Sequence, residues 1–157
     1  MRRRSLRKKR KEGYQIRNLF AGLISGAIGG MLFPLIYITA NMAPCFGLLF
    51  GDLPGVAAFG IHFGIAAACG GFFAILFQDV IQCHLANSIM TGIVYALFLF
   101  LTIHMLVFPS LRPNGIHDLW TQYPFYQIAP FILGHIIFGI ILGALYPWFH
   151  KIVRYYD

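Results

Sequence analysis

Residues 86–108 read ANSIMTGIVYALFLFLTIHMLVF and contain no Asp, Glu, Lys or Arg. An α-helix rises about 1.5 Å per residue, so about 20 residues cross the ~30 Å hydrocarbon core of a bilayer. Three further stretches of similar length also lack charged residues, and these are residues 19–40, 59–77 and 128–149. The sequence therefore predicts an all-α polytopic membrane protein with four transmembrane helices.

The composition also favours a membrane protein. Hydrophobic residues make up 59% of the 157 residues and charged residues only 11%, whereas a soluble domain has roughly a quarter of its residues charged. The lipid bilayer is therefore the expected partner. Three cysteines are too few for a disulfide-stapled secreted fold, and the chain beyond residue 17 is not basic, which argues against nucleic acid as a partner.

Positive charge is concentrated at the N-terminus. Residues 1–17 carry nine Lys or Arg and one acid, Glu12, whereas the rest of the chain carries three basic and four acidic residues. Because Lys and Arg are retained on the cytoplasmic side of a membrane, residues 1–17 are expected to form a basic cytoplasmic tail. Four crossings through residues 18–150 then return residues 151–157 to the cytoplasm as a second, short tail.

Glycines recur along three of the predicted spans at helical spacing. Lipid gives helices no hydrophobic reason to associate, so small residues that let backbones approach closely supply the contact. We expect these stripes to face one another in a tight bundle. The glycines concerned are Gly22, Gly26 and Gly30 in the first span, Gly60, Gly64 and Gly70 in the second, and Gly139 and Gly143 in the fourth.

A weak internal repeat accompanies these stripes. The pairs Ser25-Gly26 and Thr91-Gly92 each lie in an apolar run, and each run is followed by a span with a histidine eight residues before a glycine. Such a repeat predicts two helical hairpins related by an axis along the membrane normal, within an up-down bundle. The histidine–glycine pairs are His62 with Gly70 and His135 with Gly143.

Three histidines are predicted to lie at one depth. His62, His104 and His135 fall about 6, 6 and 10 Å inside the outer ends of their helices, at 1.5 Å per residue. Polar side chains within a span usually face the interior of the bundle. The sequence therefore predicts a three-histidine layer in the outer half of the membrane.

Several roles are open for this layer. Three imidazoles with one open position suit zinc, and copper is compatible with Met42, Met105 or Cys45 as a sulfur donor. Two of the rings could hold a b-type haem, or the layer could respond to pH. Alternatively, the rings only form hydrogen bonds between helices, with Asn41 as one candidate partner.

Motifs for catalysis are absent from the sequence. It contains no nucleotide-binding loop, no nucleophile elbow and no ionised group within a span that could relay protons. We expect an accessory or stress-related membrane component that is not an enzyme. The alternatives are a metal- or haem-binding subunit and a purely structural subunit, in a homo-oligomer or a larger membrane complex.

Residues 57–150 resemble the YagU-like family of small bacterial inner-membrane proteins. The resemblance lies in His62 at the start of an apolar helix, in His104-Met105 followed by Phe108-Pro109, and in Gly134-His135. It implies an inner-membrane location and a histidine at each of these three positions, and it assigns no molecular activity. The first outer loop is shorter here and the N-terminal tail is more basic than in that family.

Overall fold

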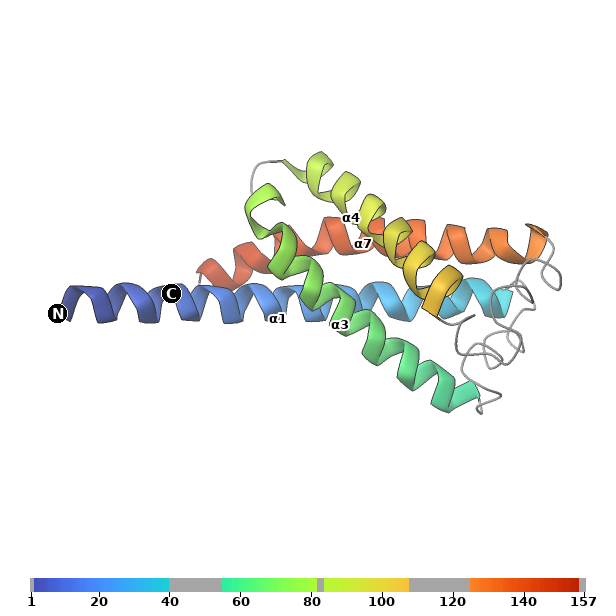
Figure 1. The fold of residues 1–157 in the computed structure, drawn as a ribbon, viewed down its shortest axis with the longest axis horizontal. Helices are drawn as coiled ribbons and strands as arrows, with labels where there is room; N and C mark the ends of the chain where they lie inside the picture. Colours follow the sequence, from blue (N-terminus) through green and yellow to red (C-terminus); the bar gives the residue numbers. More distant parts are fainter. Residues whose placement is uncertain (1, 40–54, 82–83, 108–124, 156–157) are drawn as a thin grey trace.

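The computed structural model describes residues 2–39, 55–81, 84–107 and 125–155, and every element within these ranges is helical. The elements are α1 (Arg2–Thr39), α3 (Gly55–Ile81), α4 (Leu85–Leu99), the π-helix η1 (Phe100–Val107) that continues α4, and α7 (Phe125–Tyr155). Successive helices run in alternating directions (Figure 1). The described part of the chain is therefore all-α, as the sequence predicts.

Three helical segments are long and apolar enough to cross a membrane: Val56–Ile81, Leu85–Val107 and Ala129–Ile152. They coincide with three of the four predicted spans. Their outward faces are covered with large apolar side chains, and Leu76 and Val94 are each 63% exposed. An apolar surface of this extent is typical of a protein surrounded by lipid.

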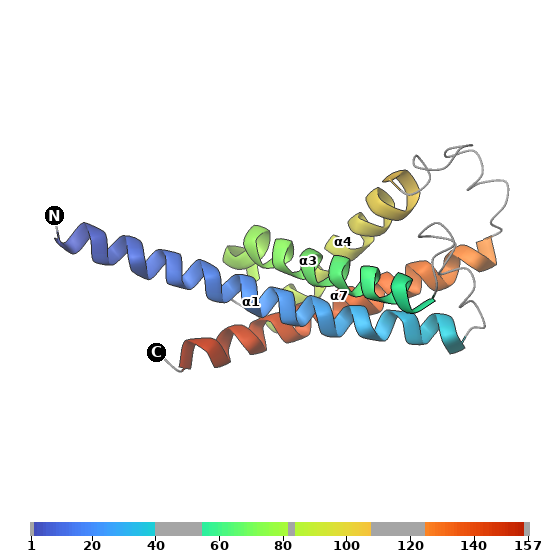
Figure 2. The same ribbon diagram turned by 90° about the horizontal axis from the view of Figure 1, so that it is seen from below.

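The first predicted span, residues 19–40, lies in the C-terminal part of α1. Among the described residues α1 does not add a fourth membrane-spanning candidate, so this span stays a prediction. The segment predicted as a basic tail is also helical, because α1 begins at Arg2 and continues without interruption to Thr39. Its N-terminal half projects beyond the other helices (Figures 1 and 2).

The helices form two hairpins. α1 packs along α3, and α4 packs along α7, while the two hairpins join mainly where α1 and α7 lie side by side and antiparallel (Figure 1). α3 and α4 make few contacts and diverge from their connected ends in both views (Figure 2). The bundle is therefore tight on three sides and open between α3 and α4.

Glycine allows α1 and α3 to cross backbone to backbone. A Cβ atom added at Gly22 would collide with the carbonyl oxygen of Gly70, and one added at Gly26 would collide with that of Ala66. At Gly30 the added atom would collide with the Cβ of Ala66. These positions therefore lie where the two helices approach most closely.

Glycine also allows α4 and α7 to cross backbone to backbone. A Cβ atom at Gly92 would collide with the carbonyl oxygen of Gly139, and one at Gly143 would collide with that of Ser88. The buried Ser88 hydroxyl also donates a hydrogen bond of 2.5 Å to the carbonyl of Gly143. Because the two crossings use residues at corresponding positions of the predicted repeat, the hairpins pack in the same way.

Gly60 and Gly64 depart from the predicted stripe. A Cβ atom at either position would meet no described atom within 4 Å. The residues of α3 that are buried towards α1 include Ala58, Ala66 and Gly70. Because each residue turns a helix by about 100°, Gly60 lies about 200° around the helix from Ala58, and Gly64 is similarly turned away.

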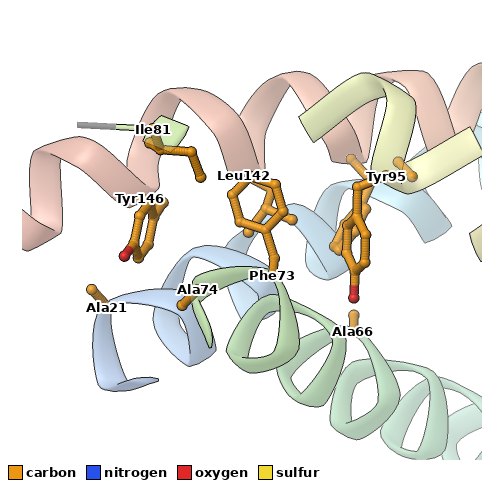
Figure 3. Packing of buried hydrophobic residues seen from close by; sticks show 10 residues of the cluster. Ala21, Ala66, Phe73, Ala74, Ile81, Tyr95, Leu142 and Tyr146 are labelled. Atoms are coloured by element: carbon orange, nitrogen blue, oxygen red, sulfur yellow. The ribbon is translucent and has the colours of Figure 1, made fainter. Parts of the chain in front are cut away.

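The apolar core fills the interior between the two crossings (Figure 3). Phe73 lies at its centre, fully buried, and its ring contacts those of Phe77, Tyr95 and Tyr146 at centroid distances of 5.3–5.9 Å. The hydroxyl of Tyr95 donates a hydrogen bond of 2.8 Å to the carbonyl of Cys69. This aromatic cluster connects α3, α4 and α7.

Candidate histidine site

His62 lies on the face of α3 that is turned towards α1. Its Nε2 atom is buried, and its ring is hydrogen-bonded to the backbone of Gly30. Gly30 is the glycine whose missing side chain lets Ala66, one turn further along α3, approach α1. The close glycine crossing therefore also brings the His62 ring against the backbone of the neighbouring helix.

His135 lies on the inward face of α7 and is only 7% exposed. Its Nδ1 atom donates a hydrogen bond of 2.7 Å to the carbonyl of Phe131, one turn earlier in the same helix. The ring of Phe100, the first residue of η1, contacts the His135 ring at a centroid distance of 5.3 Å and an interplanar angle of 61°. The orientation of the imidazole is thus determined by contacts on two sides.

The fold brings these two histidines together. His62 and His135 are close enough to interact electrostatically, although they come from different hairpins. They also hold corresponding positions, since each lies eight residues before the glycine at its helix crossing, Gly70 or Gly143. Two of the three predicted histidines therefore lie within electrostatic range of each other, one from each hairpin.

The position of His104 is known at the level of the backbone. It lies in η1, four residues after Phe100, and its side chain is outside the described set. Position 104 therefore lies in the same helical segment as Phe100, the residue that contacts His135. A π-helical segment is uncommon and occurs frequently at functional sites.

The predicted auxiliary residues are less informative. Met105 is half-buried in η1, whereas Asn41, Met42 and Cys45 lie outside the described residues. Within the described ranges, no group of three or more His, Cys, Asp or Glu side chains is placed to hold a metal ion. The described part of the site is therefore a pair of imidazoles.

The chemistry of the pair follows from its hydrogen bonds. A carbonyl oxygen only accepts hydrogen bonds, so the Nδ1 atom of His135 carries the proton, and a neutral ring then has its lone pair on Nε2. Histidines that bind metals usually donate their other ring N–H to a carbonyl or carboxylate, which fixes the tautomer and the orientation of the ring. The same hydrogen bond also satisfies a histidine that only links structural elements, so geometry alone is compatible with both roles.

A second buried polar pair was not predicted from the sequence. Asn18 on α1 is 1% exposed, and its Nδ2 atom donates a hydrogen bond of 2.8 Å to Oε1 of Gln78 on α3. The one feature of the sequence that these two amides share is their position, because each stands next to a charged residue at the end of an apolar stretch. Amides at such positions are ordinary in a solvated loop, so nothing in the pattern indicates that they pair between two helices.

Comparisons with known proteins found no matching family model, no matching curated protein and no matching solved structure. What the fold and the site define is a class of protein: an all-helical chain with three apolar, membrane-spanning-capable helices and a buried histidine pair. The resemblance to the YagU-like family stays a prediction.

Proposed function

We propose that the protein is an integral membrane protein with four spans and both termini in the cytoplasm. Three helices have the length and hydropathy of spans, and the uncharged part of α1 packs alongside α3 and α7. A helix packed between two spans lies at the same depth as they do. The nine basic residues near the N-terminus support the orientation, and the YagU-like resemblance supports the bacterial inner membrane.

The proposed role is that of an accessory membrane component that binds a transition-metal ion between its two hairpins. The observation that carries this proposal is that His62 and His135 lie within electrostatic range of each other, at corresponding positions of the two hairpins. Imidazole is the commonest nitrogen ligand of zinc and copper. His104 is the proposed third ligand, because counting residues places it at a similar depth and its segment η1 contacts His135 through Phe100.

An ion at this site would cross-link the hairpins where they meet. Polar groups inside a membrane are costly unless they are paired, and two imidazole lone pairs directed at one cation satisfy that requirement. The backbone hydrogen bonds of Gly30 and Phe131 then serve to orient the ligands. The protein itself contributes binding and geometry, and no catalytic group accompanies the site in the proposal.

A purely structural role is the second candidate, and the same hydrogen bonds favour it. In this account each ring only bonds to a backbone group of a helix, a contact that contributes about 0.6–2 kcal/mol in a membrane. The two candidates differ in whether the purified protein carries an ion. They agree that removing the histidines lowers stability.

Elemental analysis of the protein, purified in mild detergent without chelators, separates these candidates. The parent is compared with a variant in which His62, His104 and His135 are changed to Gln, and with the control His84→Gln, which removes an exposed histidine outside the site. Metal near one equivalent in the parent and the control, lost from the triple variant, supports the metal site. Iron with a haem absorbance band identifies haem instead, and no metal in any sample leaves the structural role.

A further inference from the structure

A pocket of about 240 Å³ lies between α1 and α3, at the end of the fold that carries the basic segment. It is well separated along both helices from the histidine site. Its lining combines three amides with three aliphatic side chains: Gln15, Asn18, Gln78, Ile16, Leu19 and Ile75. The pocket is not used by the function proposed above.

Asn18 is the residue that makes this pocket unusual. Its side chain is 1% exposed and its Nδ2 atom is bonded to Gln78, but its Oδ1 atom is buried and has no hydrogen-bond partner among the described residues. Most buried polar atoms in proteins have a partner, and an exception indicates a missing water or ligand. Asn18 also lines the pocket, and its hydrogen bond fixes the position of Gln78 in the same lining.

Apart from Ile16, which lies next to Gln15, the lining changes from polar to apolar with distance from the basic segment. α1 runs away from the basic segment and α3 runs back towards it (Figure 1), so Gln15 and Gln78 lie at the same end of the pocket. Leu19 and Ile75 lie about one turn further into the apolar part of the bundle. A phospholipid has the same order of groups, with a polar head followed by hydrocarbon.

The charge around the pocket favours an anionic head. Arg17 precedes Asn18 directly, and eight further basic residues lie between positions 2 and 11 of the same helix. Two acids are near the lining in sequence, Asp79, which follows Gln78 and is exposed, and Glu12, three residues before Gln15, so basic residues outnumber acids around the pocket. Basic residues at the cytoplasmic surface attract anionic lipid at about 1 kcal/mol each.

The second hairpin provides an internal comparison. The positions that correspond to Asn18 and Gln78 in the repeat are occupied by His84 and Lys151, and both of these are exposed. The bonded amides, with Asn18 buried and Gln78 half-buried, have no equivalent at the corresponding positions of the second hairpin. This pairing does not follow from the general packing of the repeat.

We infer that, in the membrane orientation proposed above, this pocket binds the phosphate group of an anionic glycerophospholipid of the inner leaflet. Amide N–H groups of Gln15 and Gln78 donate to the phosphate, and Asn18 positions Gln78 through the hydrogen bond between them. Ile75 and Leu19 contact the first carbons of the acyl chain. Binding at this pocket does not require metal at the histidine site, so either proposal can fail without the other.

Native mass spectrometry of the full chain with phosphatidylglycerol or phosphatidylcholine, added in equal amounts, tests this inference. The parent should retain phosphatidylglycerol about tenfold more than phosphatidylcholine, the ratio that ~1.4 kcal/mol of binding free energy gives. Asn18→Leu and Gln78→Leu should abolish the difference. Gln15→Leu, at an exposed position that needs no repacking, should reduce it in a chain that melts like the parent.

The control variant is Lys151→Gln, which removes a positive charge at the corresponding position of the other hairpin. Its preference for phosphatidylglycerol should equal that of the parent. Equal retention of both lipids by the parent, or equal loss in Lys151→Gln and Gln15→Leu, would overturn the inference. Glycerol phosphate added as a soluble competitor should not displace the lipid, and full displacement would show that the ligand is a free phosphoester.

Discussion

Phe73 and Tyr146 meet edge to face, with ring centroids 5.9 Å apart and an interplanar angle of 87°. They hold corresponding positions of the two hairpins, since Phe73 lies three residues after Gly70 and Tyr146 lies three residues after Gly143. Two corresponding residues that touch each other lie on the axis that relates the two halves. In the predicted repeat, an axis that relates the two hairpins passes between these two rings.

The symmetry is broken on one side by a single large residue. Where α1 meets α7, a Cβ atom at Gly29 would press against the ring of Phe138, so glycine allows the close approach. The position that corresponds to Gly29 in the second hairpin is Tyr95, which lies between α3 and α4. Its ring separates these helices, and this accounts for the few contacts that they make.

Replacing a crossing glycine by alanine should destabilise the bundle. In Gly70→Ala and Gly143→Ala the new methyl group meets backbone of the neighbouring helix, and overpacking of this kind costs about 1–3 kcal/mol. Gly64→Ala is the matched control, because its methyl group would meet no described atom. Thermal unfolding in detergent checks this, and equal melting temperatures for Gly64→Ala and Gly70→Ala would contradict the crossing.

Tyr95→Phe should weaken the contact of α3 with α4 while leaving the aromatic packing intact. The change removes only the hydroxyl that bonds to the carbonyl of Cys69, a loss of about 0.5–1.5 kcal/mol. Tyr95→Ala should cost more, about 3–5 kcal/mol, because it also leaves a cavity. If Tyr95→Phe and Tyr95→Ala lower the melting temperature equally, the ring does not hold the helices as described.

The proposed topology can be checked with reporter fusions. A reporter that is active only in the cytoplasm should be active after residue 157 and inactive after residues 50 and 115, since four spans place those loops outside. A periplasmic reporter should give the reverse pattern. Cytoplasmic activity after residue 50 would show that α1 does not cross the membrane, and the chain would then have three spans.

The apolar spans were predictable because their length and lack of charge depend only on the thickness of the bilayer. The glycines at the helix crossings and the repeat that contains them could also be predicted, because only glycine leaves enough room where two helix backbones are in contact. The face that each residue presents was harder to predict: Gly60 and Gly64 fit the same spacing as the others, but α3 is rotated so that they point away from α1. The rotation of a helix about its own axis depends on the helix that it packs against. Because successive residues are about 100° apart around the helix, a small error in this rotation moves a residue to another face.

The candidate site was also predictable only in part. The depth of His62 and His135 follows from counting residues, whereas their proximity depends on how the two hairpins pack along α1 and α7. The π-helix at Phe100–Val107 changes the direction in which the side chains along it point, relative to an α-helix. Its sequence contains no feature that predicts a π-helix. The Asn18–Gln78 pair depends on α1 and α3 aligning two amides 60 residues apart.

We propose that one ion is shared by the two hairpins through His62 and His135. The decisive measurement is a zinc titration of the metal-free protein that compares the parent, His62→Gln, His135→Gln and the double variant. We predict one site per chain, and we predict that each single change weakens binding by at least about 100-fold, because even a change beyond the direct ligands costs 10–100-fold. The double variant should be little weaker than either single one, since all three have lost the same site. A parent that binds no zinc, or a single variant that binds it as tightly as the parent, would contradict the claim.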